Sequence, residues 1–338
     1  MKNLAKNGLS VGLIALISIA IMNSQCLADV SRTVEKTFEV KPKGTLAIDS
    51  DHGSITVQSK ITEIVSIEVI LVADVSSEKS AESVFEEFHL DFAQKGDNVF
   101  VTGKKEGNGL GLFDNSNKLK VKFIATVPEK FNLDLNTAGG SITVGDLDGQ
   151  LVARTAGGSL DFGSISGSVD GKTAGGSIRL KGSGDNVALK TAGGSISIGP
   201  VNGNAEVKTS GGSIRTGEVT GALEAHTAGG SISIDGVAGA VDAKTSGGSV
   251  WATIMKQPKE ECTLTTSGGN IAVSLPDNIS VSIQARTFGG KVSTDLPITV
   301  KGELSKSQIQ GTLNGGGPAL ILETSSGNIS ISKSREVL

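Results

Sequence analysis

The chain has 338 residues, 31 of them basic and 35 acidic, which gives a formal charge of −4. This mildly acidic balance disfavours nucleic acid as a partner, because binding to phosphates needs clustered Lys and Arg. The 46 glycines come with only 7 prolines and no Gly-X-Y period, which excludes collagen, and 37% hydrophobic residues exclude a disordered chain.

Residues 1–28 are predicted to form a secretory signal peptide. Lys2 and Lys6 make a positive start, an apolar run covers residues 9–22, and small side chains precede a cleavage point after Ala28. We therefore expect an exported protein, in the periplasm or at the cell surface or beyond it. No later segment approaches the ~20 apolar residues of a spanning helix, so the processed chain is not expected to be transmembrane. Acylation of Cys26 is the alternative, although the three residues before it do not fit a lipoprotein signal.

Signal removal takes away two lysines and no acid, so the formal charge becomes −6. Only Cys262 then remains, and a single thiol cannot form a disulfide within the chain. Stability is therefore expected to come from packing.

Residues 29–135 are predicted to be a strand-rich segment that continues into the rest of the chain. A short helix is predicted at about 77–90, because serines offer an N-cap and Ala81, Val84, Phe85 and Phe88 share a helical face. Such a helix would cover an end or flank and hide a strand edge. Residues 103–118 are predicted to form a mobile loop between strands.

From residue 136 to 338 the sequence is dominated by a repeat of the form Thr-Ala/Ser-Gly-Gly-Ser-aliphatic. Its strict copies follow one another at a constant step and start at Thr137, Thr155, Thr173, Thr191, Thr209, Thr227 and Thr245. Looser copies start at Thr266, Thr287 and Thr324, and a degenerate copy starts at Ser50. Such strict spacing indicates stacked structural units.

Aliphatic residues recur at positions six and eight of the repeat, at eleven, and at fifteen and seventeen. Alternation with a period of two indicates half-buried strands, and two such strands plus one apolar corner describe a three-sided coil. By the same parity the Thr of position one points inward. Gly139-Gly140 and their copies are predicted to turn the chain through positive φ angles, and Gly149 and its copies to form a second corner.

The fold class is therefore all-β. We predict a single-stranded β-helix, or β-solenoid, of three-sided coils of about 18 residues, one repeat to each coil, with one short helix in the N-terminal flank. A left-handed helix of hexapeptide repeats has coils of the same length, but it requires an aliphatic residue where position five is Ser. Right-handed winding is the favoured interpretation.

Three blocks of the sequence resemble the DUF4097 family, β-strand repeat proteins of bacteria that carry an adhesin label. They are FEVKPKGTLAIDSDHGSITV at 38–57, KFIATVPEKFNLDLNTAGGSITV at 122–144 and LNGGGPALILETSSGNISIS at 313–332. The resemblance covers nearly the whole processed chain. It implies a single β-helical body and an envelope or surface location, and it carries over no functional residues.

Catalysis needs unlike residues that converge on one place, whereas this chain offers the same residue in every coil. His52 is predicted in a turn, His89 at the helix end, and His226 in a column of basic residues, so a structural or solvated role is favoured for each. The neighbours Asp51, His52 and Ser54 are discounted as a triad, because triads are recognised by geometry. One cysteine and scattered histidines do not make a zinc motif. We predict no metal and no cofactor.

One patterned surface remains, formed by position eighteen of the repeat. Its residues are Arg154, Lys172, Lys190, Lys208, His226 and Lys244. Mostly acidic residues occupy position sixteen of the same face: Asp170, Glu206, Glu224 and Asp242. The basic column is a candidate binding strip for a charged polymer. The favoured alternative is a solvated face whose opposite charges relieve repulsion between coils.

The preferred function is an exported, non-enzymatic scaffold or adhesin-like module of the cell envelope. Its partner is not specified by the sequence, with envelope polysaccharide or another envelope protein as candidates. A polysaccharide lyase or hydrolase is the alternative, since many such enzymes are β-helices, but 3% aromatic residues and no irregular acidic cluster speak against it. An ice-binding face is disfavoured because the Thr column points inward.

Overall fold

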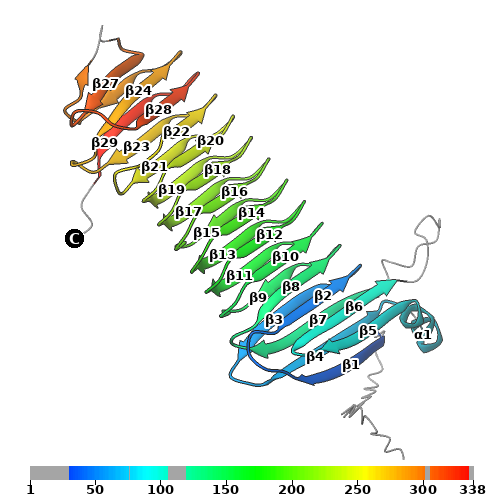
Figure 1. Cartoon of the computed structure of the whole chain (residues 1–338). Coiled ribbons are helices and arrows are strands. Elements are labelled where there is room, and N and C mark those ends of the chain that lie inside the picture. The colour runs from blue at the N-terminus through cyan, green and yellow to red at the C-terminus, as the bar shows by residue number, and fades with distance from the viewer. Residues whose placement is uncertain (1–29, 76, 106–118, 301–304, 335–338) are drawn as a thin grey trace, which may run out of the picture.

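The computed structural model describes residues 30–75, 77–105, 119–300 and 305–334, which form one elongated stack of coils (Figure 1). The predicted signal peptide, with Cys26, lies outside the described residues, and so do residues 106–118 of the predicted loop. Residues 103–105 continue a strand instead. Within the described part of the chain, no helix has the length and apolar character needed to cross a membrane.

The predicted β-solenoid is confirmed. The strands form a 14-stranded sheet, called sheet A here, and a 15-stranded sheet, called sheet B. Through the strict repeats each coil gives one strand to each sheet, and equivalent residues pair in parallel register, as Ile178 does with Ile196. In sheet A these strands are β9 (Ile142–Val144), β11 (Leu160–Ile165), β13 (Ile178–Ser183), β15 (Ile196–Ile198), β17 (Ile214–Val219), β19 (Ile232–Val237), β21 (Val250–Ile254) and β23 (Ile271–Leu275). In sheet B they are β8 (Asn132–Thr137), β10 (Leu151–Thr155), β12 (Val169–Lys172), β14 (Val187–Lys190), β16 (Ala205–Lys208), β18 (Leu223–His226), β20 (Val241–Lys244) and β22 (Cys262–Thr266).

Position eleven makes the short third side of the coil. Bridges join Leu147 to Ile165, Ser183 to Val201, and Val201 to Val219, and the ends of β11 and β13 pair Ile165 with Ser183. The apolar members of this ladder are buried. One residue per coil is thus enough to close the core between the two sheets.

The N-terminal end is built from β1 (Val30–Glu39), β2 (Thr45–Ser50), β3 (Ser54–Lys60), β4 (Ile64–Ala73), α1 (Glu78–Glu86), β5 (Phe88–Lys95), β6 (Asn98–Lys105) and β7 (Leu119–Pro128). Strands β1, β4 and β7 pair antiparallel, and so do β5 and β6. The helix has the predicted Ser77 N-cap but ends at Glu86, earlier than predicted. Phe88 and His89 belong to β5, because the strand pairing with β6 overrides the helical pattern. Helix α1 contacts β1, β4 and β5, so it covers the flank of this end.

The C-terminal end contains β24 (Val281–Thr287), β25 (Val292–Thr294), β26 (Thr299–Val300), β27 (Gln308–Leu313), β28 (Ala319–Thr324) and β29 (Ile329–Lys333). Strand β27 pairs antiparallel with both β24 and β26. Antiparallel strands thus interrupt the parallel order at both ends of sheet B and at the N-terminal end of sheet A, whereas β25 ends sheet A in parallel order.

The order of stacking departs from the order of the sequence at both ends. The coil made by β2 and β3 lies between β8–β9 and β6–β7, so Ser50 stacks on Thr137. The last coil in the sequence, β28 and β29, lies between β22–β23 and β24–β25, so Thr324 stacks on both Thr266 and Thr287. In Figure 1 the red strand β28 accordingly lies between the orange β24 and the yellow β22. Near each end, one coil is thus inserted between coils that are its neighbours in space but not in sequence.

The Thr of position one points inward, as predicted, and it carries a hydrogen bond along the stack. Thr173 Oγ1 donates to the Gly158 carbonyl of the preceding coil at 2.7 Å and accepts from the backbone N–H of Gly176 at 3.3 Å. Only a hydroxyl both donates and accepts at one atom, and the methyl group of Thr fills the space beside it. This explains the choice of Thr in every strict copy.

The prediction of positive φ at the repeated glycines is wrong. Among the described glycines only Gly53, Gly96, Gly315 and Gly316 have positive φ. The second glycine of each pair is needed for a different reason: a Cβ at Gly158 would lie less than 3.0 Å from the Gly140 carbonyl of the coil beneath. Close stacking of the coils, and not the turn angle, demands glycine there.

Candidate functional site

The outer face of sheet B gathers all residues of the predicted basic strip. Parallel pairing places Arg154 beside Lys172, and it continues in register to Lys190, Lys208, His226 and Lys244. These side chains point outward because positions fifteen and seventeen of the same strands fill the core. The six residues therefore form one ladder along the solenoid.

Each residue of this basic ladder contacts a carboxylate. Lys208 Nζ lies 2.9 Å from Glu206 Oε1 and 2.6 Å from Glu224 Oε1, so it joins the acids of two successive coils. The other contacts are Arg154 with Asp170 at 3.2 Å, Lys172 with Asp170 at 3.3 Å, Lys190 with Glu206 at 2.7 Å, His226 with Glu224 and Asp242 at 3.2 Å each, and Lys244 with Asp242 at 2.9 Å. The cations and acids alternate as two interlocked ladders.

The pairing changes the acidity of the groups at its centre. Hydrogen bonds from Lys190 and Lys208 lower the pKa of Glu206 to about 2. Hydrogen bonds to Glu224 and Glu206 raise the pKa of Lys208. Both side chains are about one third exposed, so water screens the attraction and each pair contributes little to stability. These contacts favour the interpretation of the ladder as charge compensation between coils.

His226 is the exception in the basic ladder. Its ring lies between two carboxylates, with Nδ1 3.2 Å from Glu224 Oε1 and Nε2 3.2 Å from Asp242 Oδ2. The second oxygen of Asp242 is buried and has no hydrogen-bond partner. The sequence showed that a histidine stands in a basic column, but the two-sided contact follows only from the stacking of adjacent coils.

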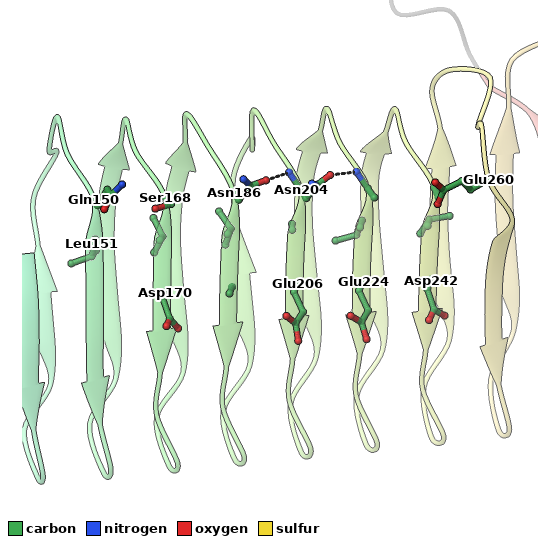
Figure 2. A pocket seen from close by; sticks show the side chains of 18 of the residues that line it. Gln150, Leu151, Ser168, Asp170, Asn186, Asn204, Glu206, Glu224, Asp242 and Glu260 are labelled. Carbon is green, nitrogen blue, oxygen red and sulfur yellow. Dashed lines mark hydrogen bonds between the residues drawn. The ribbon is translucent and has the colours of Figure 1, made fainter. Parts of the chain in front are cut away.

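A groove runs along the axis of the solenoid beside the acidic ladder, with a volume of about 730 Å³. Figure 2 shows it crossing the strands, between a row at position fourteen and a row at position sixteen. The first row contains Gln150, Ser168, Asn186, Asn204, Ala222 and Ala240, and the second contains Val152, Asp170, Ala188, Glu206, Glu224 and Asp242. The sequence did not predict this groove, because the copies of the repeat have no common residue type at position fourteen that would mark it.

The amides of the first row have a fixed direction. Asn186 Oδ1 accepts from the backbone N–H of Asn204 at 2.8 Å, and Asn204 Oδ1 accepts from that of Ala222 at 2.8 Å (Figure 2). The oxygen of each amide is thus occupied by the next coil. The NH₂ group is the part that remains to donate outward.

One end of the groove is bounded by the loop between β21 and β22. The step from Thr245 to Thr266 is longer than the step between the strict copies, and the extra residues enlarge this loop. Its Glu260 and Glu261 line the groove, and Figure 2 shows Glu260 on the loop above the strands. The lining therefore contains six carboxylates and no Lys or Arg.

The remaining histidines do not join this face. His52 follows β2 in a bend, where its Nδ1 contacts its neighbour's carbonyl oxygen. Asp51 instead pairs with Lys104 at 3.1 Å, so the discounted triad of Asp51, His52 and Ser54 has no shared geometry. His89 lies in β5, in the antiparallel pair with β6. Cys262 is buried in the core, and burial raises the pKa of its thiol.

Comparisons with known proteins give a family and several matches among solved structures. A family model described as Toastrack DUF4097 matches residues 44–332. No curated protein matches the chain. Among solved structures, a "putative lipid binding protein" from Parabacteroides distasonis is 12% identical, with a TM-score of 0.37, and the match covers 90% of this chain and 97% of that one.

Two further solved structures also match the chain. A "putative adhesin" from Parabacteroides distasonis is 12% identical, with a TM-score of 0.32, and the match covers 89% of this chain and 97% of that one. A "putative cell adhesion protein" from Clostridium sporogenes is 14% identical, with a TM-score of 0.19, and the match covers 89% of this chain and all of that one.

Proposed function

Given that the chain belongs to the Toastrack DUF4097 family, we propose that it is an exported, non-enzymatic module of the cell envelope with an adhesin-like or scaffold role. The observation that carries the proposal is the axial groove on sheet B, to which six successive coils contribute side chains at the same two positions. A surface that repeats along a rod suits contact with a long partner more than conversion of a small one.

A linear polysaccharide is the partner that this groove supports best. Its two rows repeat at the strand spacing of about 4.8 Å, so a polymer whose units have a similar length meets the same two positions at each coil. Hydroxyl groups both donate and accept, so they fit the amide NH₂ donors of one row and the carboxylates of the other. Four of the six carboxylates in the lining contact cations of the basic ladder, and the other two, Glu260 and Glu261 at one end, disfavour a polyanion, so we take the polymer to be neutral.

The non-enzymatic assignment is supported by the sameness of the coils. Glycosidases place two carboxylates with different environments on either side of one bond. Here the carboxylates of Glu206, Glu224 and Asp242 each contact a lysine of the basic ladder, so their environments are alike. A polysaccharide lyase or hydrolase is the alternative, and release of reducing ends or unsaturated products from a panel of uronic and neutral polymers would establish it instead.

Binding is tested by native electrophoresis in gels that contain a soluble neutral β-glucan, with alginate as the anionic comparison. The double variant Ala188→Leu/Ala222→Leu fills both rows of the groove at partly exposed positions, and Ser197→Leu is the matched control on the exposed face of sheet A. We expect the β-glucan to retard the wild type and the control but not the double variant. Equal mobility of all three proteins would contradict the groove as the contact surface.

Location is tested separately, by cell fractionation and by protease treatment of intact cells. We expect the protein in the periplasmic or surface fraction, without a signal peptide in the mature chain. Recovery of full-length, unprocessed protein from the cytoplasm would contradict export while leaving the binding test unaffected.

A further inference from the structure

The position of His226 differs chemically from its equivalents in the ladder. In the preceding coil, Lys208 places a permanent positive charge between two acids, at 2.9 Å from Glu206 and 2.6 Å from Glu224. In the coil of His226 the facing acids are Glu224 and Asp242, which are direct partners in the parallel pairing of β18 and β20. The imidazole between them offers two ring nitrogens in place of an ammonium group. This interval of the ladder is the one that holds a metal-ligating atom.

The ligand atoms around this interval are close together. One nitrogen of His226 and one carboxylate oxygen from each of Glu224 and Asp242 lie within 4.8 Å of one another. All three side chains are partly exposed, so an ion reaches them directly from solvent. Asp242 Oδ1 is buried without a hydrogen-bond partner, which leaves an acceptor available that no other group uses.

We propose that Glu224, His226 and Asp242 form a binding site for a divalent transition-metal cation, with Zn²⁺ as the best fit. Imidazole nitrogen and carboxylate oxygen are the usual Zn²⁺ ligands besides thiolate, at about 2.0–2.2 Å from the ion. The ligand atoms would have to close around the ion from separations within 4.8 Å, and water would complete the coordination. Ca²⁺ and Mg²⁺ prefer oxygen ligands only, so the histidine selects against them.

The neighbouring lysines keep partners when the ion is bound. Lys244 contacts Asp242 Oδ2 at 2.9 Å, so Oδ1 is the oxygen that turns to the ion. Lys208 retains Glu206 at 2.9 Å when Glu224 turns away from it. Both ammonium groups repel the ion, so the site depends on the imidazole nitrogen and is lost without it.

The test is a titration of the untagged protein with ZnCl₂ at pH 7.5, followed by isothermal calorimetry. His226→Lys is the matched variant, because it restores the residue type of most neighbouring coils while it removes the nitrogen ligand. We expect one saturable ion per wild-type chain and at least a tenfold loss of affinity in H226K. His52 and His89 are present in both proteins, so their contribution cancels in the comparison.

A relocation variant makes the test independent of folding. In the double variant His226→Lys/Lys208→His the new histidine takes the place of Lys208 between Glu206 and Glu224, one coil away. We expect this variant to regain one ion, and thermal melts without metal should show all three proteins folded. Equal Zn²⁺ binding by wild type and H226K, or no binding by the wild type, would overturn the proposal.

Discussion

Gly158 stacks directly on Gly140 of the preceding coil, so closely that a Cβ on Gly158 would lie less than 3.0 Å from the Gly140 carbonyl oxygen. Its neighbour Gly157 is different, because the nearest atom to an added Cβ there is the Gly139 carbonyl oxygen at 3.5 Å. The irregular copies that start at Ser50 and Thr324 follow the same rule. Their first glycine position holds His52 or Ser326, whereas the second keeps a glycine, Gly53 or Gly327. The two glycines of each pair are therefore not equivalent.

We expect Gly158→Ala to destabilise the protein by about 3 kcal/mol, because the methyl group meets backbone that cannot move aside. Gly157→Ala should stay within about 0.5 kcal/mol of the wild type, since its Cβ makes an ordinary contact. Thermal melts followed by circular dichroism compare the two variants. A similar loss for both would show that the turn, and not the stacking, requires the glycines.

The same Thr→Val substitution at two threonines of one coil should change the stability of the protein in opposite directions. Thr209 Oγ1 donates to the Gly194 carbonyl at 2.7 Å, so Thr209→Val leaves this partly buried carbonyl without its donor and should cost about 1–3 kcal/mol. Thr216 is fully buried at position eight, and its Oγ1 has no hydrogen-bond partner. Thr216→Val should therefore stabilise the protein by about 1 kcal/mol. Chemical denaturation measures both, and a destabilised T216V would contradict the assignment of an unsatisfied hydroxyl.

The column assignment itself is tested by one core residue and one ladder residue. Ile196 is 1% exposed and pairs in register with Ile178 and Ile214, so Ile196→Asp should disrupt its coil by several kcal/mol, roughly the cost of burying a carboxylate. Lys208→Ala removes a screened surface ion pair and should cost less than about 1 kcal/mol. Equal melting temperatures for the two variants would contradict the assignment of Ile196 to a buried column and of Lys208 to an outward-facing one.

The low pKa of Glu206 predicts a specific loss of stability in acid. Hydrogen bonds from Lys190 and Lys208 lower this pKa from 4.5 to about 2, so the folded state favours the ionised carboxylate. The contribution is complete above pH 4.5 and disappears as the pH falls towards 2. Glu206→Gln should therefore reduce the difference in melting temperature between pH 5 and pH 2. An unchanged acid profile would show that this carboxylate has an ordinary pKa.

The intercalated last coil predicts unequal effects of two deletions. Removal of residues 319–338 takes away β28 and β29, so β22 and β23 lose their partners within the stack and should expose edges that associate. Removal of residues 191–208 takes out one whole coil and joins Lys190 to Thr209 in register, so a shorter, folded monomer is expected. Size-exclusion chromatography and limited proteolysis compare the two. If the terminal truncation is monomeric and resists proteolysis, the placement of β28 and β29 between β22–β23 and β24–β25 is contradicted.

The regular part of the fold was predictable because the sequence repeats it. A constant step between the copies fixes which positions stack, and alternation then decides which side chains point inward, as for Ile196 and Thr173. The glycine requirement was predicted at the right positions for the wrong reason. A close approach between coils depends on the rise of the stack, which a single coil's sequence does not encode.

The ends and the candidate sites were harder to predict for a common reason. Ser50 pairs with Thr137 although several other strands separate the two in the sequence, and Thr324 is inserted between segments that precede it. Neither order follows from the spacing of the copies. The contacts of His226 with Glu224 and Asp242, and the groove beside them, likewise arise between coils and not within one.

The strict register of the middle coils also bears on how the gene can change. Each of these coils presents its successor with the same pattern of backbone groups and the same buried positions. An unequal exchange between two nearly identical coding units therefore adds or removes a whole rung without a new interface. The number of coils can therefore change by whole units from one generation to the next, while the segments that close the two ends of the stack stay as they are.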